Sequence, residues 1–331
     1  MNSDPGSLDQ RRESRLEVVR QETWRGWAKT LWLMVLAMRP PMWLKPLFLM
    51  LVAQSYALHD LPYLGTLLYG LLIVGPLLWG GLYALNAVSD IEDDRLHPVK
   101  RYRPLASGDL SPRLAAGVSC LAIAAALLLS MRVNGYFALC VAIMAVKQLL
   151  YTLPGIRLKE HSPWDIITGS LFNSSLRFSA GWFMVTTASF PPVLMLVLAE
   201  SLQMAGFLVN RLMTDYSDGL ETKLGYRSTV VRYGQRAVRT RIVLLWGLGL
   251  LAFAGLIANR FLLFYPSLLG ELPVQALWVL GLLILALPAF AGILGRVNRL
   301  SPRQAELYYD LPLVYVLLLA VVLSVILKLY H

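Results

Sequence analysis

Apolar residues in this chain gather into long runs that are separated by short polar stretches. A helix needs about 20 mainly apolar residues to cross a bilayer core about 30 Å thick. Runs that come close to that length are rich in Leu and Ala and do not alternate as strands do. They predict nine transmembrane helices, at residues 42–58, 64–88, 114–131, 136–153, 164–185, 191–213, 242–258, 274–294 and 311–329. The predicted fold class is an all-α integral membrane bundle.

Composition excludes the main classes of soluble protein. The 331 residues are 57% hydrophobic and 15% charged, whereas soluble domains average about 45–50% apolar and 25% charged residues. The same figures exclude a disordered chain. Cys120 and Cys140 both lie inside apolar runs, so the sequence indicates neither a disulfide framework nor a cysteine metal site.

The net charge of +10 is explained by membrane topology. Most Lys and Arg residues fall before the first predicted span and in every second loop after it, whereas the opposite side carries Arg132, Arg260 and Lys328. The positive-inside rule places the N-terminus and the basic loops in the cytoplasm. Nucleic acid is therefore not needed as a partner to explain the positive charge. The long polar loops at 89–111 and 214–240 then lie on the cytoplasmic side, where we expect the chemistry.

Residues 1–41 are predicted to form an arm that precedes the nine-span domain at 42–331. The stretch 15–36 mixes Arg and Glu with Trp24, Trp27 and Trp32. That mixture is typical of a helix lying in the membrane interface. A helical arm that packs on the domain is the alternative.

An acidic motif follows the second predicted span. Asn86, Asp90 and Asp94 are spaced four residues apart, so on a helix they form one stripe of oxygen-bearing side chains. Oxygen ligands without His or Cys favour Mg²⁺. A solvated helix end is the alternative, but a carboxylate placed directly after an apolar span is costly and usually functional.

A basic loop comes directly after this motif and carries Lys100, Arg101 and Arg103. Carboxylates and cations in one segment are suited to a complex of Mg²⁺ with a diphosphate. Attraction to an anionic membrane leaflet is the alternative reason for the cations.

A second polar segment ends the sixth predicted span. Asn210, Thr214 and Asp218 repeat the four-residue spacing, and Asp215 lies beside them. Cations that include Arg227 follow. The two helix ends are expected to face each other across a cavity and to hold one or two metal ions, whereas an ordinary cytoplasmic loop is the alternative for the second segment alone.

With these motifs the chain resembles the UbiA superfamily of membrane prenyltransferases over nearly its whole length from Met38. The resemblance implies a bundle around a central cavity open to the cytoplasm, an isoprenoid lipid substrate that enters from the bilayer, and a diphosphate donor. It further implies that Mg²⁺ is held by Asn86, Asp90 and Asp94, with a second ion at Asp215 and Asp218. The substrate-binding residues that follow from it are Lys45, Lys100, Arg101, Arg103, Tyr151, Lys159, Arg177, Arg211 and Arg227.

Further elements are similar to those of the polyprenyl-phosphate phosphoribosyltransferases. They are RPPMWLK at 39–45, HPVKRYRP at 97–104, and Tyr151, Lys159, Asp165, Gly169 and Arg177. Two departures from the superfamily pattern stand out. Ala87 occupies a position where an Asp is usual, and Thr214 one where an acid is expected.

Two reactions remain open on this resemblance. One transfers a prenyl group from an isoprenyl diphosphate and ranks slightly ahead, on the strength of Asp215, Asp218 and the 225–229 segment. The other transfers phosphoribose from phosphoribosyl diphosphate to a polyprenyl phosphate, and the basic 97–103 loop favours it. A secondary transporter ranks last, because its charges would lie at mid-membrane in repeated broken helices.

Two cations, Lys147 and Arg177, lie in the fourth and fifth predicted spans. Lys147 either extends to the membrane interface or reaches a substrate phosphate. Arg177 lies deeper, so it is expected to face the interior cavity. A structural ion pair with Glu200 is the alternative for Arg177.

Overall fold

A computed structural model describes residues 26–58, 63–97 and 100–264 of the chain. The described part is helical, with a single isolated β-bridge between His161 and Arg227. After a helix at Gly26–Ala37, the elements are η1 (Pro40–Trp43), α2 (Leu44–Leu58), α3 (Leu64–Leu72), η2 (Ile73–Gly80), α4 (Gly81–Ser89), α5 (Ile91–Leu96), η3 (Lys100–Tyr102), α6 (Pro112–Ser130), α7 (Gly135–Thr152), η4 (Leu158–Glu160), α8 (Trp164–Gly169), α9 (Asn173–Phe183), α10 (Val193–Asp218), α11 (Leu220–Lys223) and α12 (Thr229–Phe264).

The predicted spans are confirmed for most of the described chain. Five helices are long and apolar enough to cross a membrane, at Leu64–Ser89, Pro112–Ser130, Gly135–Thr152, Val193–Leu212 and Thr229–Leu256. The first predicted span is α2 with the turn before it, and it joins the preceding helix at a bend of 47°. The spans predicted at 274–294 and 311–329 lie outside the described residues.

The prediction of one continuous helix over 164–185 is wrong, because α8 and α9 are separate. Phe172 has a positive φ of 66° at the break. The ammonium of Lys147 donates to the carbonyl of Leu171 and to Oδ1 of Asn173, the latter at 3.0 Å. Nδ2 of Asn173 donates to the carbonyl of Gly169 at 2.8 Å. Because these polar side chains satisfy the backbone of the break, an apolar run of helical length contains an interruption.

Two helices extend well beyond their predicted spans. The sixth span is predicted to end at 213, but α10 continues to Asp218. The seventh is predicted to begin at 242, but α12 begins at Thr229 and contains a kink at Gly234, whose φ is 72°. Hydropathy marks only the part of a helix that lies in lipid, so the polar turns outside it are missed.

The second span changes its helical period midway. Residues of α3 and α4 are α-helical, whereas η2 between them is a π-helix that contains Pro76. Proline lacks the N–H that an α-helix requires, and a local π segment accommodates the missing bond. Gly81 then allows close packing, since an added Cβ there would lie 3.0 Å from the carbonyl oxygen of Ser119 on α6.

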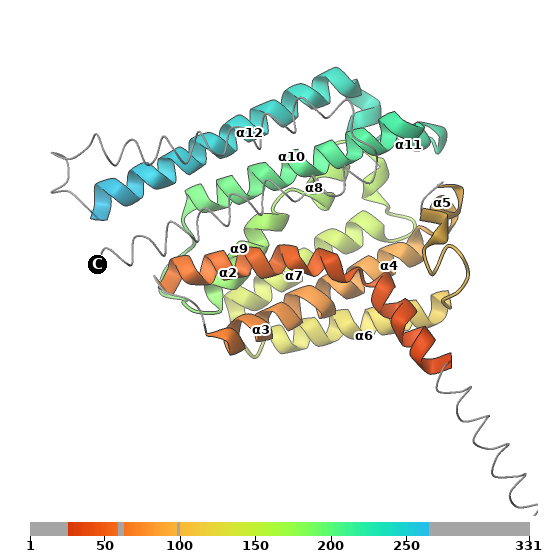
Figure 1. Ribbon diagram of the computed structural model, residues 1–331, viewed down its shortest axis with the longest axis horizontal. Helices are drawn as coiled ribbons and strands as arrows, with labels where there is room; N and C mark the ends of the chain where they lie inside the picture. The colour runs from red at the N-terminus through yellow and green to blue at the C-terminus, as the bar shows by residue number, and fades with distance from the viewer. Residues whose placement is uncertain (1–25, 59–62, 98–99, 265–331) are drawn as a thin grey trace, which may run out of the picture.

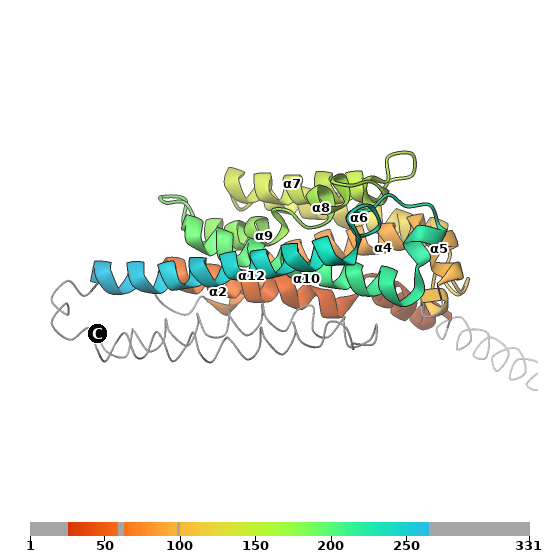
Figure 2. The same ribbon diagram turned by 90° about the horizontal axis from the view of Figure 1, so that it is seen from above.

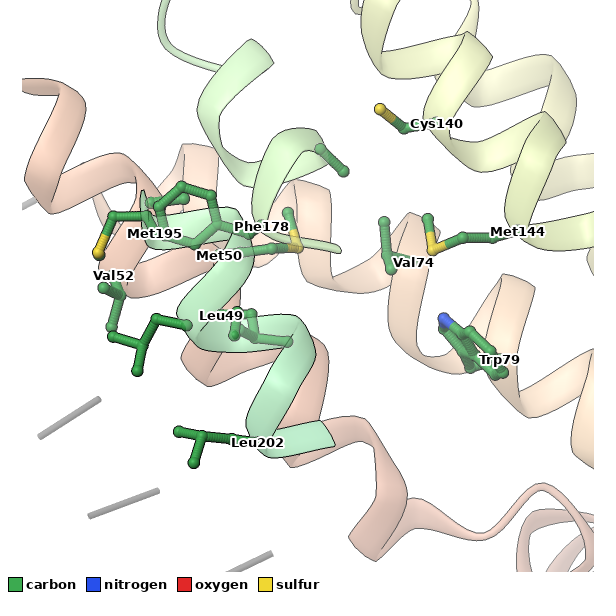
Figure 3. Packing of buried hydrophobic residues seen from close by; sticks show 14 of the residues in the cluster. Leu49, Met50, Val52, Val74, Trp79, Cys140, Met144, Phe178, Met195 and Leu202 are labelled. Carbon is green, nitrogen blue, oxygen red and sulfur yellow. The ribbon is translucent and has the colours of Figure 1, made fainter. Parts of the chain in front are cut away.

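The long helices run side by side along the long axis of the molecule (Figure 1). Figure 2 shows α7 and α9 on one side of the bundle and α10, α12 and α2 on the other. Side chains buried between the helices form the main core, and Figure 3 shows part of it, including Met50, Phe178, Met195, Val74, Trp79 and Met144. Leucines on outer faces, such as Leu121 and Leu251, are 73% and 72% exposed, as expected for side chains that meet lipid.

Gly181 sets the distance between α2 and α9. A Cβ at this position would lie 2.6 Å from the Cα and 3.0 Å from the carbonyl oxygen of Met50, so α2 would have to move. We expect Gly181→Ala to lower the free energy of unfolding by about 1–3 kcal/mol, measured by thermal unfolding in detergent. Gly117→Ala on α6 is the matched control, because nothing lies within 4 Å of its added Cβ. Equal stability of the two variants would contradict this packing.

The helix at Gly26–Ala37 packs by one face and exposes the other. Met34 and Ala37 are buried in a smaller cluster with α4 and α6 residues. Trp27, Leu31 and Trp32 are each more than 60% exposed. This helix therefore packs on the domain by one face and presents aromatic side chains on the other.

Candidate active site

The acidic motif keeps its stripe where α4 meets α5. Asp90 has a φ of −102° and separates the two helices. The backbone N–H of Asp90 nevertheless donates to the carbonyl of Asn86 at 3.0 Å, and that of Asp94 to Asp90 at 2.7 Å. Nδ2 of Asn86 donates to Oδ2 of Asp90 at 2.9 Å. The three oxygen-bearing side chains therefore emerge on one face.

Cations from two different loops meet these carboxylates. Lys159 on η4 is 5% exposed, and its ammonium forms an ion pair with Oδ1 of Asp90. Arg103, which follows η3, forms an ion pair of 2.9 Å with Oδ2 of Asp94. Asn86 is held from a third side, because the hydroxyl of Thr152 donates to its Oδ1 at 2.6 Å. The ends of α4, α7 and η4 thus converge at one end of the bundle.

Positive charge exceeds negative charge around Asp94. Burial lowers the pKa of Lys100, and the charges of Arg103 and Arg39 lower it further, while Asp94 opposes them. The guanidinium of Arg39 lies over the ring of Tyr83, 5.5 Å from its centre. Asp90 acts on Lys100 and Arg39 as well, so three cations lie near two carboxylates, and a polyanionic ligand would relieve the remaining repulsion among the cations.

The oxygen donors of this site suit Mg²⁺. Asp90 and Asp94 offer carboxylates and Asn86 an amide, which are the ligands that Mg²⁺ takes alongside water and substrate phosphate oxygens. In the part of the chain that the structure describes, no three His, Cys, Asp or Glu side chains come together to hold an ion. A metal held here would therefore take further ligands from water and from a bound anion.

A group of three side chains, which we call the clasp, ties the acidic motif to two loops. Arg157 forms ion pairs with Asp93 and with Glu160, and the hydroxyl of Tyr226 donates to Oδ2 of Asp93 at 2.7 Å. Arg157 also donates to the Tyr226 hydroxyl at 2.9 Å. The clasp consists of Asp93, Arg157 and Tyr226, and it holds the loop of Lys159 against the acidic motif.

The clasp predicts a pH dependence of stability. Burial raises the pKa of Asp93, but the Tyr226 hydrogen bond and the Arg157 charge outweigh it and leave the pKa below the ordinary 3.8. A carboxylate with a lowered pKa stabilises the folded state above pH 3.8, and this contribution is lost as the pH falls through the folded pKa. Thermal unfolding between about pH 3 and about pH 7 measures it. We expect Asp93→Asn to melt below wild type at neutral pH and to converge with it in acid.

Tyr226→Phe tests the same clasp by removing one hydroxyl group. Burial and the bond to Asp93 raise the pKa of Tyr226, so it stays neutral and donates at neutral pH. Its loss is expected to raise the pKa of Asp93 and to shift the acid loss of stability to higher pH. Identical pH profiles for wild type and both variants would contradict the clasp.

A second buried network surrounds Arg211 on α10. Its guanidinium donates to Glu221 at 2.8 Å, to the carbonyl of Lys159 at 2.7 Å and to Asp165 at 3.4 Å. Asp165 in turn accepts from the backbone N–H and the hydroxyl of Thr229, both at 2.7 Å. Arg211 was predicted to contact phosphate. Here its Nη1 and Nη2 atoms donate to protein groups and anchor the backbone of the loop that carries Lys159, while its buried Nε has no acceptor among the described residues.

The other predicted substrate-binding residues differ in their surroundings. Lys45 is buried in the first turn of α2. Tyr151 packs against Gly169, where an added Cβ would lie 2.6 Å from its ring. Arg101 is on the exposed side of its loop and donates to the hydroxyl of Tyr102 at 2.7 Å.

Arg227 contacts the loop of Lys159 through its backbone. Its N–H donates to the carbonyl of Glu160 at 2.7 Å, and its carbonyl accepts from the N–H of Ser162 at 2.8 Å. The side chain itself is exposed. Asp215 and Asp218 are in the last turns of α10, and their side chains lie outside the described residues.

Sequence reasoning did not single out three residues of the site. Asp93 lies inside the acidic run but off its four-residue spacing, and Arg157 lies 64 residues away from it in the sequence. Glu221 lies in the second polar segment, and it accepts from Ser228 at 2.5 Å as well as from Arg211. A search for charged residues next to each predicted helix end would have found all three.

Comparison with known proteins agrees with this architecture. The model of the UbiA prenyltransferase family matches residues 44–311. A curated relative, the decaprenyl-phosphate phosphoribosyltransferase of Mycolicibacterium smegmatis, is 30% identical over 123 residues, which are 36% of this chain and 38% of the relative. The chain therefore matches well under half the length of that relative.

Solved structures share the fold. A UbiA homolog from Archaeoglobus fulgidus bound to GPP and Mg²⁺ has a TM-score of 0.61 at 19% identity, with 86% of this chain and 99% of that chain covered. A digeranylgeranylglyceryl phosphate synthase has a TM-score of 0.65 at 18% identity, with 89% and 98% covered. The chain is thus an integral membrane transferase, and it belongs to the UbiA prenyltransferase family.

Proposed function

We propose that the protein transfers 5-phosphoribose from phosphoribosyl diphosphate to a polyprenyl phosphate. The observation that supports this most is the group of cations Arg39, Lys100 and Arg103 around Asp94. Phosphoribosyl diphosphate carries a 5-phosphate in addition to its diphosphate. Its binding therefore requires more cations than the binding of a prenyl diphosphate does. The name of the curated relative from M. smegmatis adds support, and this reaction now ranks ahead of prenyl transfer.

In this proposal Asn86, Asp90 and Asp94 hold Mg²⁺, which when bound supplies positive charge to the leaving diphosphate. Lys159 and Arg103, which pair with the two carboxylates, turn toward the diphosphate and share its charge. The bond from ribose C1 to the diphosphate breaks, and an oxygen of the acceptor phosphate forms the new bond to C1. Lys100 and Arg39 bind the 5-phosphate.

Prenyl transfer from an isoprenyl diphosphate is the second candidate. It is favoured by the shared fold with the A. fulgidus structure, which is bound to GPP and Mg²⁺. In this case Asp215 and Asp218 would hold a second ion, as the family resemblance implies. The same Asn86, Asp90 and Asp94 would serve the diphosphate of either donor.

We infer that the site faces the cytoplasm and that the N-terminus lies on the same side. The basic loops support this orientation through the positive-inside rule. The exposed Trp27, Leu31 and Trp32 support an arm that lies in the membrane interface. Cysteine labelling from either side of sealed vesicles would test the orientation, since single cysteines introduced at Arg101 and Arg132 should react from opposite sides.

Donor choice tests the proposed function. Purified protein is incubated with Mg²⁺ and one of two pairs, either labelled phosphoribosyl diphosphate with a polyprenyl phosphate or labelled geranylgeranyl diphosphate with an aromatic acceptor. We expect pyrophosphate release and a labelled lipid with phosphoribosyl diphosphate, and loss of both when Mg²⁺ is chelated. Turnover of the prenyl donor with an aromatic acceptor would establish the second candidate instead.

A further inference from the structure

Arg177 lies deep between the helices with unused hydrogen-bond donors. It is on α9, which packs against α2, α7 and α10, and it is 2% exposed. Its Nε and Nη1 atoms are buried, and no acceptor among the described residues lies within hydrogen-bonding distance of them. An unpaired guanidinium is costly in a membrane interior, so such a group marks a ligand site more often than a structural one.

The charged side chains next to Arg177, which are Lys147 and Glu200, form their hydrogen bonds with other groups. Lys147, which interacts electrostatically with both Arg177 and Glu200, donates to Leu171 and Asn173. Oε2 of Glu200 accepts from the backbone N–H of Ser175 at 3.2 Å and from its hydroxyl at 3.1 Å, while its buried Oε1 has no hydrogen-bond partner among the described residues. The structural pair of Arg177 with Glu200, considered from the sequence, is therefore not formed. Two cations and one carboxylate leave this layer with a positive surplus.

Aromatic stacking fixes the guanidinium of Arg177. Its Cζ lies 4.1 Å from the centre of the Trp79 ring, which is itself 2% exposed. A guanidinium held with one face on an aromatic ring keeps its N–H edge for the oxygens of an oxyanion such as phosphate or carboxylate. The stack therefore orders the side chain without using its hydrogen-bond donors.

The position of this layer relative to the acidic motif follows from the helices. Trp79 precedes Asn86 on the second span, which places it about 10 Å deeper at 1.5 Å per residue. Lys147 precedes Thr152, the partner of Asn86, by about 7 Å along α7. Arg177 thus lies on the membrane side of the diphosphate position, where the headgroup of a substrate embedded in the bilayer would be.

We propose that Arg177 forms an inner oxyanion subsite that binds the phosphate of the lipid acceptor. The inference rests on the proposed function, because that reaction requires two anion positions on opposite sides of the reacting carbon. The outer position takes the diphosphate at Asp90 and Asp94, and the inner one presents the acceptor phosphate. An aromatic carboxylate has the same charge chemistry and is the other source of an anion for this subsite.

Binding without catalysis tests the subsite. Calorimetry on the purified full chain, without donor and without Mg²⁺, compares farnesyl phosphate, farnesol and 4-hydroxybenzoate. We expect Arg177→Gln to weaken farnesyl phosphate binding at least about tenfold and to leave farnesol binding unchanged. Arg177→Lys should retain part of the affinity. Arg132→Gln is the control for an exposed cation far from the subsite and should bind as wild type.

The outcomes separate the subsite from the proposed function. Loss of 4-hydroxybenzoate binding alone in Arg177→Gln would keep the oxyanion subsite and overturn phosphoribosyl transfer. Equal binding of both anions by wild type and Arg177→Gln would overturn the subsite, whatever donor is turned over. If Arg177→Gln does not fold, Glu200→Gln tests the subsite through the opposite change in binding. Removing this carboxylate should tighten farnesyl phosphate binding severalfold, and unchanged binding would count against the subsite.

Discussion

Replacement of Asp90 by Asn is expected to abolish transfer while the protein stays folded. Asp90 is the centre of the acidic motif, with Asn86 bonded to one oxygen and Lys159 paired with the other. Replacing a residue that only supports a metal ligand typically lowers metal affinity or activity by about 10–100-fold. A proposed direct ligand should cost more, and we expect a fall in kcat of about a thousandfold, measured as Mg²⁺-dependent pyrophosphate release.

Glu92→Gln is the matched control for this experiment. Glu92 belongs to the same acidic run, but its side chain is 83% exposed and, among the described residues, pairs only with Arg95 at 2.9 Å. It should keep activity within about twofold, because exposed ion pairs contribute little. Substantial turnover by Asp90→Asn, or an equal loss in Glu92→Gln, would remove the metal role from Asp90. Thermal unfolding of both variants shows that the comparison concerns folded protein.

Replacement of Arg211 by Ala is expected to have the largest effect on stability. Its guanidinium neutralises the buried Glu221 and Asp165 and holds the carbonyl of Lys159. Breaking a buried pair by removing one partner costs about 3–5 kcal/mol, because the remaining charge is buried without compensation. Unfolding of Arg211→Ala in detergent should reveal a loss of that size, with activity reduced in parallel.

Arg232→Ala separates this effect from a general loss of positive charge. Arg232 is an exposed cation near the same loops, which donates to the carbonyl of Ser162 at 3.4 Å and lies 5.5 Å from the centre of the Tyr233 ring. It should unfold close to wild type. Restored stability in a double variant, Arg211→Ala with Glu221→Gln, would support the charge explanation. Wild-type stability of Arg211→Ala alone would contradict it.

Local spacing predicts the acidic stripe well. Asn86, Asp90 and Asp94 are joined by bonds between residues four apart, which are a property of one helix. Apolar run lengths predict the confirmed spans for the same reason, since each span satisfies its own backbone. The break between α8 and α9 is different, because it depends on Lys147 from another helix.

Contacts between residues that are far apart in the sequence cannot be predicted from local spacing. Asp90 and Lys159 are 69 residues apart in sequence, and Asp93 and Tyr226 are 133 apart. Each contact depends on how α4, η4 and the loop before α12 are brought to one end of the bundle. The family resemblance supplied Lys159 as a site residue, but neither spacing nor resemblance indicated that Arg157 and Tyr226 hold its loop in place.

The π-helical segment of the second span absorbs one residue between the two α-helical halves of that span. An α-helix turns by about 100° per residue, and a π segment accommodates an extra residue without breaking the span. Deleting one residue within Ile73–Gly80 would restore the α period and keep the membrane-crossing length nearly intact. Asn86 and Asp90 would then still face Thr152 and Lys159, whereas deletion of one residue of α4 before Asn86 would turn them away by about 100°. The middle of this span therefore tolerates a change in length that the turns next to the acidic motif do not.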